Sequence, residues 1–122
     1  MLLVDDEPSV CDAIKLILAE DGHEVLTAAS GAEALLAYRV GQFDLLITDY
    51  EMPVMKGDKL AAAIKRLAPQ QRVILITAYA ESLRASGDFP LAVDAVISKP
   101  FDVQEFRNTV YRLTQGTSQL SR

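Results

Sequence analysis

The sequence has little of what small secreted or membrane proteins depend on. It contains one cysteine, Cys11, which rules out an internal disulfide, and its 122 residues are enough to bury a hydrophobic core without one. No apolar run approaches the roughly 20 residues that cross a membrane, and no charged and apolar leader precedes the first acidic residues. We therefore expect one compact domain that works in the cytoplasm.

Positive charge is also scarce. The 17 acidic residues outnumber the 12 basic ones, which gives a net charge of −5 at pH 7. A surface of this sign repels the phosphates of nucleic acids and the head groups of anionic lipids. We expect proteins or small ions as partners, and no direct binding of this domain to nucleic acid or membrane.

Short apolar segments alternate along the chain with longer segments of helical periodicity, the pattern of repeated β-α units around a parallel sheet. The expected strands cover residues 1–4, 23–29, 43–49, 73–77 and 95–98. The expected helices cover residues 8–20, 31–40, 57–67, 81–94 and 103–113. We assign residues 1–115 to the domain and the polar residues 116–122 to a tail or linker.

The fourth helical segment differs from the others. Gly87 and Pro90 fall in its middle, and an interior proline costs a helix about 3 kcal/mol. We therefore expect this helix to be short or irregular. The last helix has a regular apolar side, and Val103, Phe106 and Val110 are expected to face the sheet.

Polar residues stand at the ends of four expected strands. Asp5 and Asp6 end the first strand and Asp49 ends the third. Thr77 ends the fourth strand and Lys99 follows the fifth. In doubly wound sheets, ligands bind beyond the carboxyl ends of the strands, where strand order reverses. These five residues are therefore the candidate site.

The residue types at this edge indicate a metal and a phosphoryl group. Carboxylates about 4 Å apart repel each other by about 4 kcal/mol per pair at an effective dielectric constant of about 20, and the single ammonium of Lys99 cannot neutralise three of them. A hard divalent cation relieves the repulsion, and oxygen ligands suit Mg2+ better than zinc. The Thr77 hydroxyl and the Lys99 ammonium are the donors that phosphoryl oxygens need, which leaves Asp49 as the nucleophile.

Four short motifs occur in order at these strand ends: LVDDE at residues 3–7, DYEMP at 49–53 followed by Gly57, ITA at 76–78 and KPF at 99–101. Each motif is weak alone, but together they resemble the receiver domain of bacterial response regulators in two-component signalling, notably the chemotaxis-type and NtrC-type receivers. The resemblance covers nearly the whole chain. It implies an α/β, flavodoxin-like doubly wound (βα)5 three-layer sandwich with a five-stranded parallel sheet of order 2-1-3-4-5.

The resemblance makes Asp49 the phosphorylation site. It makes Mg2+ the cofactor, with Mn2+ able to replace it, and the ligands are then the carboxylates of Asp6 and Asp49, the backbone carbonyl of Glu51 and, through water, Asp5. The phosphoryl donor is expected to be a sensor histidine kinase or a histidine phosphotransfer protein. The domain would then be a signalling switch and not an enzyme, apart from catalysing its own phosphorylation and dephosphorylation.

The resemblance also assigns the residues on the other side of the nucleophile. Thr77, the backbone of Ala78 and Lys99 would bind the phosphoryl oxygens. Receivers typically have a cis peptide after this lysine, here Lys99-Pro100. Phosphorylation would draw Thr77 inward and reshape the surface of the fourth helix, fifth strand and fifth helix, through which an effector domain or a second copy could bind.

Three positions depart from or vary within the receiver pattern. Receivers usually place a tyrosine or phenylalanine three residues before the lysine, where this chain has Val96. We therefore expect activation to rearrange residues 80–94 instead. Glu51 and Tyr79 lie two residues beyond the nucleophile and the threonine, and we expect both to modulate the lifetime of the phosphoryl group.

Two other protein classes share parts of this pattern. A Mg2+-dependent phosphatase of the haloacid dehalogenase type also uses a strand-end aspartate, but it needs a second aspartate two residues on, where this chain has Glu51, and a cap domain for its substrate. A flavodoxin-like flavin binder shares the architecture, but Asp5, Asp6 and Glu7 would repel the phosphate that its loop binds. The kinase and the output stay open.

Overall fold

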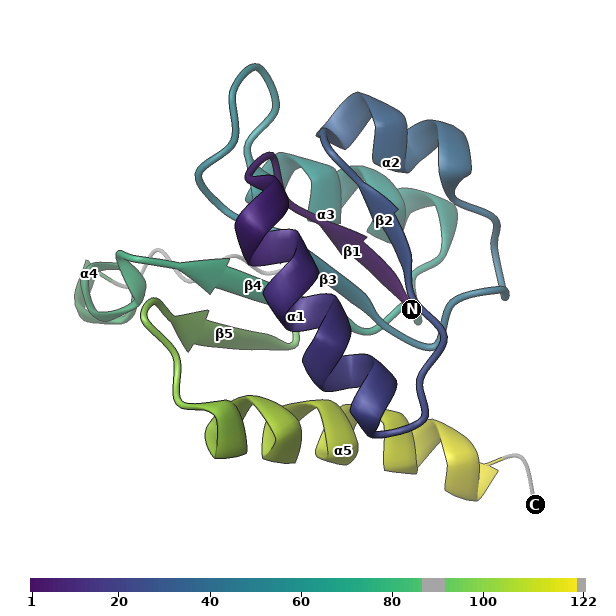
Figure 1. Ribbon diagram of the computed structural model, residues 1–122. Helices are drawn as coiled ribbons and strands as arrows, with labels where there is room; N and C mark the ends of the chain where they lie inside the picture. Colours follow the sequence, from purple (N-terminus) through teal and green to yellow (C-terminus); the bar gives the residue numbers. More distant parts are fainter. Residues whose placement is uncertain (87–91, 121–122) are drawn as a thin grey trace.

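The computed structural model describes residues 1–86 and 92–120, which form a parallel sheet between two layers of helices (Figure 1). The strands are β1 (Leu2–Val4), β2 (Leu26–Ala28), β3 (Leu46–Asp49), β4 (Val73–Thr77) and β5 (Ala95–Ser98). The helices are α1 (Pro8–Glu20), α2 (Gly31–Ala37), α3 (Gly57–Leu67), α4 (Ala80–Ser86) and α5 (Val103–Leu120). All neighbouring strands are parallel in the order β2-β1-β3-β4-β5, which confirms the flavodoxin-like topology.

Helices α1 and α5 cover one face of the sheet. The spacing of Cys11, Ile14 and Leu18 places them on one side of α1, and all three are buried. Phe106 and Val110 of α5 are buried in the same apolar cluster. Figure 1 shows α1 in front of the sheet and α5 along its lower side. Among the described residues, no helix is both long and apolar enough to span a membrane.

Helices α2, α3 and α4 contribute to the core on the opposite face. Successive residues of a strand point to opposite sides of a sheet, so Leu2 and Val4 face this layer while Leu3 faces α1. Leu60 and Ile64 of α3 are fully buried against it. The sheet is therefore covered on both faces, which leaves the strand ends as the place where polar side chains can gather.

Several element boundaries differ from those expected. Strands β2 and β3 begin at Leu26 and Leu46, three residues later than expected, because β1 offers only three residues for pairing on either side. Helix α2 ends at Ala37, since the next residue already has extended backbone angles. Helix α5 continues to Leu120, beyond the expected end at residue 113.

The described part of α4, Ala80–Ser86, has seven residues, and the structure does not describe the residues that follow it, 87–91. Gly87 and Pro90, which led us to expect a short or irregular helix, lie outside the described residues. The expectation that Val103 faces the sheet is wrong, because its side chain is 44% exposed. Phe101 instead packs against Phe106, with ring centroids 5.2 Å apart, and covers that end of the apolar layer.

Candidate functional site

The register of the parallel strands brings the polar strand-end residues to one edge of the sheet. Strands β1 and β3 pair up to their carboxyl ends, so Asp5 follows β1 beside Asp49 of β3. Strands β4 and β5 pair in the same way, and the N–H of Lys99 donates to the carbonyl of Thr77 at 2.9 Å. The residues that the sequence predicted for the site are therefore neighbours in the structure.

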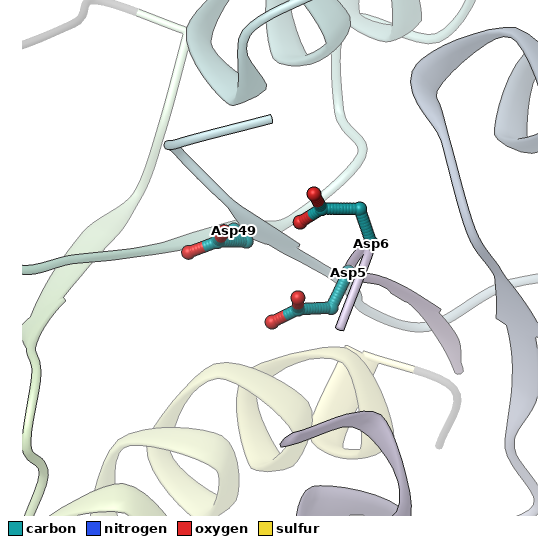
Figure 2. A group of neighbouring side chains, drawn as sticks. All are labelled: Asp5, Asp6 and Asp49. Atoms are coloured by element: carbon teal, nitrogen blue, oxygen red, sulfur yellow. The ribbon is translucent and has the colours of Figure 1, made fainter. Parts of the chain in front are cut away.

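Three aspartates form an acidic cluster at this edge. Asp5 and Asp49 are 3% and 2% exposed, whereas Asp6 is exposed to solvent. One carboxylate oxygen of each lies within 4.8 Å of the others. Figure 2 shows the three side chains extending to the same side, from the end of β1 and from β3. Carboxylates this close repel one another, so the cluster is a candidate cation site.

The two buried carboxyl groups are difficult to ionise. Burial raises the pKa of Asp5, although the N–H of Glu7 donates to its Oδ1 at 2.9 Å and favours the charged form. Burial also raises the pKa of Asp49 to about 6, with the charge of Asp5 adding to the effect and Lys99 opposing it. The fold thus places both carboxylates where added positive charge would stabilise them.

Lys99 supplies one positive charge to the cluster. Its Nζ lies 2.6 Å from Asp49 Oδ1 and 4.0 Å from Asp5 Oδ2. Burial by itself would lower the pKa of Lys99, but the pairing with Asp49 and the charges of Asp5 and Glu51 together outweigh burial and raise it. One ammonium leaves the acidic cluster with a net negative charge.

The donor set of the acidic cluster fits a hard divalent cation. Within the described part of the chain, the buried Oδ1 of Asp49 accepts no hydrogen bond of regular geometry and has only the ion pair with Lys99. Carboxylate oxygens without a nearby thiol or imidazole ligand in the cluster suit Mg2+ rather than zinc. Asp5, Asp6 and Asp49 are the side chains that would hold such an ion, and the ion would offset their mutual repulsion.

On the other side of Asp49, two of the three groups predicted to bind the phosphoryl oxygens, those of Thr77 and Ala78, are bonded to Glu51. The Thr77 hydroxyl donates to Glu51 Oε2 at 2.5 Å, and the N–H of Ala78 donates to Oε1 at 3.2 Å. The N–H of Tyr79 donates in turn to Thr77 Oγ1 at 3.0 Å. Sequence reasoning gave Glu51 a backbone-carbonyl role and a modulating role, but it missed this side-chain contact. The only signal in the sequence is an acidic residue two positions after the aspartate that ends β3.

The loop that carries Glu51 is held against the end of β3 by Gly57. A Cβ at this position would overlap the carbonyl oxygen of Asp49, so a larger residue requires the backbone to move. The N–H of Gly57 also donates to the carbonyl of Tyr50 at 3.1 Å. Gly57, which follows the DYEMP motif, thus allows the loop to close tightly against Asp49.

The remaining predicted residues lie around this centre. Tyr79 is 59% exposed at the rim. Val96 is buried in the apolar cluster beneath α4, and Arg84 Nη2 of α4 donates to its carbonyl at 3.0 Å. The Lys99-Pro100 peptide bond is cis, as the resemblance implied.

Relatives of this chain have been identified from sequence. The response regulator receiver domain family matches residues 1–111. Transcriptional regulatory protein GlrR of Escherichia coli is 36% identical over 102 residues, which cover 84% of this chain and 23% of GlrR. Sporulation initiation phosphotransferase F of Bacillus subtilis is 29% identical over 110 residues, which cover 90% of this chain and 89% of that protein.

A solved structure agrees with these relatives. Response regulator protein TrrA from Thermotoga maritima, in complex with Mg2+-BeF, matches this fold with a TM-score of 0.83 and 37% sequence identity, over 92% of this chain and 96% of TrrA. The chain spans between 23% and 53% of the length of the first curated relatives that it matches. Because the family match covers residues 1–111 of the 122, the chain belongs to the response regulator receiver domain family.

Proposed function

We propose that this domain accepts a phosphoryl group on Asp49 in a Mg2+-dependent reaction and thereby switches its contacts with other proteins. The observation that carries the proposal is the setting of Asp49. It is a buried carboxylate at a strand end, with Asp5 and Asp6 on one side and the Lys99 ammonium 2.6 Å away. A nucleophile for phosphoryl transfer needs this combination of a fixed position and nearby positive charge.

The transfer itself requires positioning and charge neutralisation. An oxygen of Asp49 attacks the phosphorus of a phosphohistidine, a P–O bond forms as the P–N bond breaks, and the released imidazole takes a proton from solvent. The Lys99 ammonium, the Thr77 hydroxyl and the N–H of Ala78 are the donors for the phosphoryl oxygens. Hydrolysis of the acyl phosphate by water then returns the Asp49 carboxylate and inorganic phosphate.

Mg2+ is the cofactor in this proposal, and Mn2+ can take its place. Asp5, Asp6 and Asp49 would hold the ion together with the backbone carbonyl of Glu51. When bound, the ion supplies positive charge that offsets these carboxylates and the incoming phosphoryl oxygens. The support from this structure is the shared position of the three carboxylates, since their oxygens lie within 4.8 Å of one another.

The proposed phosphoryl donor is a sensor histidine kinase or a histidine phosphotransfer protein in the cytoplasm. The proposed output surface is formed by α4, β5 and α5, and an effector domain or a second copy would bind there. Residues 1–115 are the proposed extent of the domain, with 116–122 as a tail or linker. Catalysis is limited to the domain's own phosphorylation and dephosphorylation.

The two alternative classes find no support. In the phosphatase interpretation, the residue two positions after Asp49 would act as acid and base on the substrate. Glu51 occupies that position, but its carboxylate is bonded to Thr77 and Ala78. The flavin-binding interpretation would place a phosphate loop where Asp5 and the other acidic residues cluster.

Phosphorylation with a small donor tests the proposal. We expect incubation with acetyl phosphate and Mg2+ to add one phosphoryl group, detected by intact-mass spectrometry, and we expect Asp49→Asn to abolish the adduct. Asp44→Asn, at the opposite edge of the sheet, removes the same charge and should be phosphorylated like the wild type. An adduct that persists in Asp49→Asn, or that forms equally without divalent cation, contradicts the proposal.

A further inference from the structure

The side chain of Glu51 accepts hydrogen bonds from two donors that, in the proposed function, bind the phosphoryl oxygens. One carboxylate oxygen accepts from the Thr77 hydroxyl at 2.5 Å and the other accepts from the N–H of Ala78 at 3.2 Å. Two oxygens of one anion are thus matched to two neighbouring donors at the end of β4. A phosphoryl group on the adjacent Asp49 would present the same kind of oxygens to the same donors.

We propose that Glu51 is a built-in competitor for the phosphoryl site. In the resting domain its carboxylate occupies the phosphoryl-oxygen donors, and phosphorylation has to displace it. The inference rests on the proposed function, which puts the phosphoryl group on Asp49, and it adds a regulatory role for a side chain that belongs neither to the acidic cluster nor to the donors.

The competition follows from the number of protons available. A threonine hydroxyl has one proton to donate. The N–H of Tyr79 donates to Thr77 Oγ1 at 3.0 Å, which occupies an acceptor site of that oxygen, and the hydroxyl proton is directed to Glu51. The same proton cannot serve a phosphoryl oxygen at the same time. The single hydrogen on the backbone nitrogen of Ala78 is subject to the same limit.

Charge acts in the same direction. A phosphoryl group carries about −1.5 to −2 charges at neutral pH, so a carboxylate on the same donors would repel it. Burial is the main cause of the raised pKa of Asp49, and the negative charge of Glu51 also contributes to it. The field of Glu51 therefore already reaches the nucleophile in the resting state.

Glu51 is also the member of this contact that can move. Thr77 and Asp49 are buried residues of paired strands, and their positions are fixed by the sheet. Glu51 lies in the loop after β3 and is partly exposed. The Glu51 side chain can turn toward solvent without a change in the sheet. The Thr77 hydroxyl, in contrast, stays at the end of β4, the strand that pairs with β3 and Asp49.

The resting contact is tested first, in metal-free and unphosphorylated protein. We expect Glu51→Ala to shift the backbone amide resonances of Ala78 and Tyr79 in 15N–1H NMR spectra, and to speed hydrogen exchange at Ala78 several-fold because its acceptor is lost. Glu24→Ala removes the same charge from an exposed position before β2 and should leave these resonances unchanged. Unshifted Ala78 and Tyr79 signals in Glu51→Ala would contradict the contact itself.

The competition is tested with beryllofluoride and Mg2+, used as a phosphoryl analogue in calorimetric titrations. We expect Glu51→Ala to bind the analogue about tenfold more tightly than the wild type, since hydrogen bonds to a charged group no longer have to be broken first. Glu51→Gln should fall between the two, because its amide oxygen still accepts a hydrogen bond while the charge is gone. Glu24→Ala should match the wild type.

A double-mutant cycle shows whether the effect passes through Thr77. In a Thr77→Val background, we expect Glu51→Ala to tighten binding by less than about threefold, because the hydroxyl that Glu51 occupies is absent. A purely structural role of Glu51 predicts weaker or unchanged binding in Glu51→Ala, and that result would overturn the competitor role while phosphorylation of Asp49 stands. Failure of every variant to bind the analogue, together with no adduct on Asp49, would overturn the proposed function and the competition with it.

Discussion

The two halves of the site are in opposite states. The acidic half, Asp5, Asp6 and Asp49, contains buried carboxylates with raised pKa values and an oxygen held only by an ion pair. The donor half, Thr77 and Ala78, is satisfied, because both donors are bonded to the carboxylate of Glu51. The resting domain is therefore prepared to take up a cation, whereas an anion has to displace a group that is already bound.

The difference has a structural origin. The acidic half is built from residues at or directly after paired strands, so their separation is fixed by the sheet and their repulsion cannot relax. The occupant of the donor half comes from a loop, and a loop side chain can leave at the cost of its own hydrogen bonds. The carboxylates of the acidic half are thus held close together despite their repulsion, while the donor half is occupied by a side chain that can leave.

The largest expected effect is that of Mg2+ on the acidic half. A ligand that binds only the folded state at 100 times its Kd adds about 2.7 kcal/mol to the free energy of unfolding. We expect Mg2+ at that ratio to raise the melting temperature of the metal-free domain, as measured by differential scanning calorimetry. Asp6→Asn, which removes one carboxylate from the exposed side of the cluster, should reduce the increase. No increase beyond that given by sodium at equal ionic strength would contradict a cation site.

A smaller effect is expected from neutralising Asp49 in the absence of metal. The pKa of Asp49 is raised from 3.8 to about 6, so protonation favours the folded state. The stability tied to the protonated form is fully present below about pH 4 and is lost as the pH rises through about 6. Because the pKa of about 6 already includes the opposing effect of Lys99, we expect Asp49→Asn to be about 2 kcal/mol more stable than the wild type at pH 7.

Urea unfolding at two pH values checks this expectation. The advantage of Asp49→Asn should be present at pH 7 and absent near pH 4, where the wild-type carboxyl group is neutral as well. Asp44→Asn provides the comparison, since its carboxylate is 44% exposed and lies outside the cluster. An advantage of equal size at both pH values would show that the gain has a cause other than ionisation of Asp49.

How far the sequence predicts the molecule also differs between the two halves. The acidic half was predictable because apolar segments define strands, and parallel strands bring their carboxyl ends to one edge. The residues that follow these strands were placed correctly without knowledge of any side-chain angle. The same reasoning predicted α1, α3, β4 and β5 with the observed ends.

The donor half was predicted only as a set of residues. The contact between Glu51 and Thr77 depends on the path of the loop after β3 and on a side-chain rotamer, and neither is encoded by periodicity. The errors elsewhere have similar causes. The ends of β2 and β3 depend on the length of β1, and the exposure of Val103 depends on where Phe101 packs.

A still smaller effect is expected in the loop that carries Glu51. Val54 has φ of 70° and is fully exposed, so a β-branched residue occupies a left-handed conformation without contributing to packing. Glycine adopts this conformation without strain, but it also gains entropy in the unfolded chain. We expect Val54→Gly to stabilise the domain by about 0.5–1 kcal/mol in urea unfolding.

The matched control for this substitution is Val54→Ala. Alanine keeps the Cβ that disfavours positive φ, so it should give less than half of the gain. Binding of beryllofluoride by Val54→Gly should equal that of the wild type, because the change relieves the loop without removing the carboxylate of Glu51. Tighter binding would mean that strain in the loop, and not the carboxylate, limits access to the donor half.

An effect as small as that of Val54→Gly is expected in the segment that we expect to carry the response. Arg84 of α4 donates to the carbonyl of Val96, and Asp94 accepts from the N–H of Val73 at 2.8 Å, so both ends of residues 80–94 are tied to the sheet. Arg84→Met should cost about 0.5–1 kcal/mol for one hydrogen bond to a partly exposed group.

Glu81→Gln breaks the exposed ion pair of Arg84 but keeps its bond to Val96, so it should cost less than Arg84→Met. In the absence of beryllofluoride, the amide resonances of residues 80–86 in Arg84→Met should lie closer to their beryllofluoride-bound positions than those of the free wild type do. If these resonances do not respond to beryllofluoride at all, the donor half is not coupled to α4. The proposed output surface of α4, β5 and α5 would then not be the output of the switch.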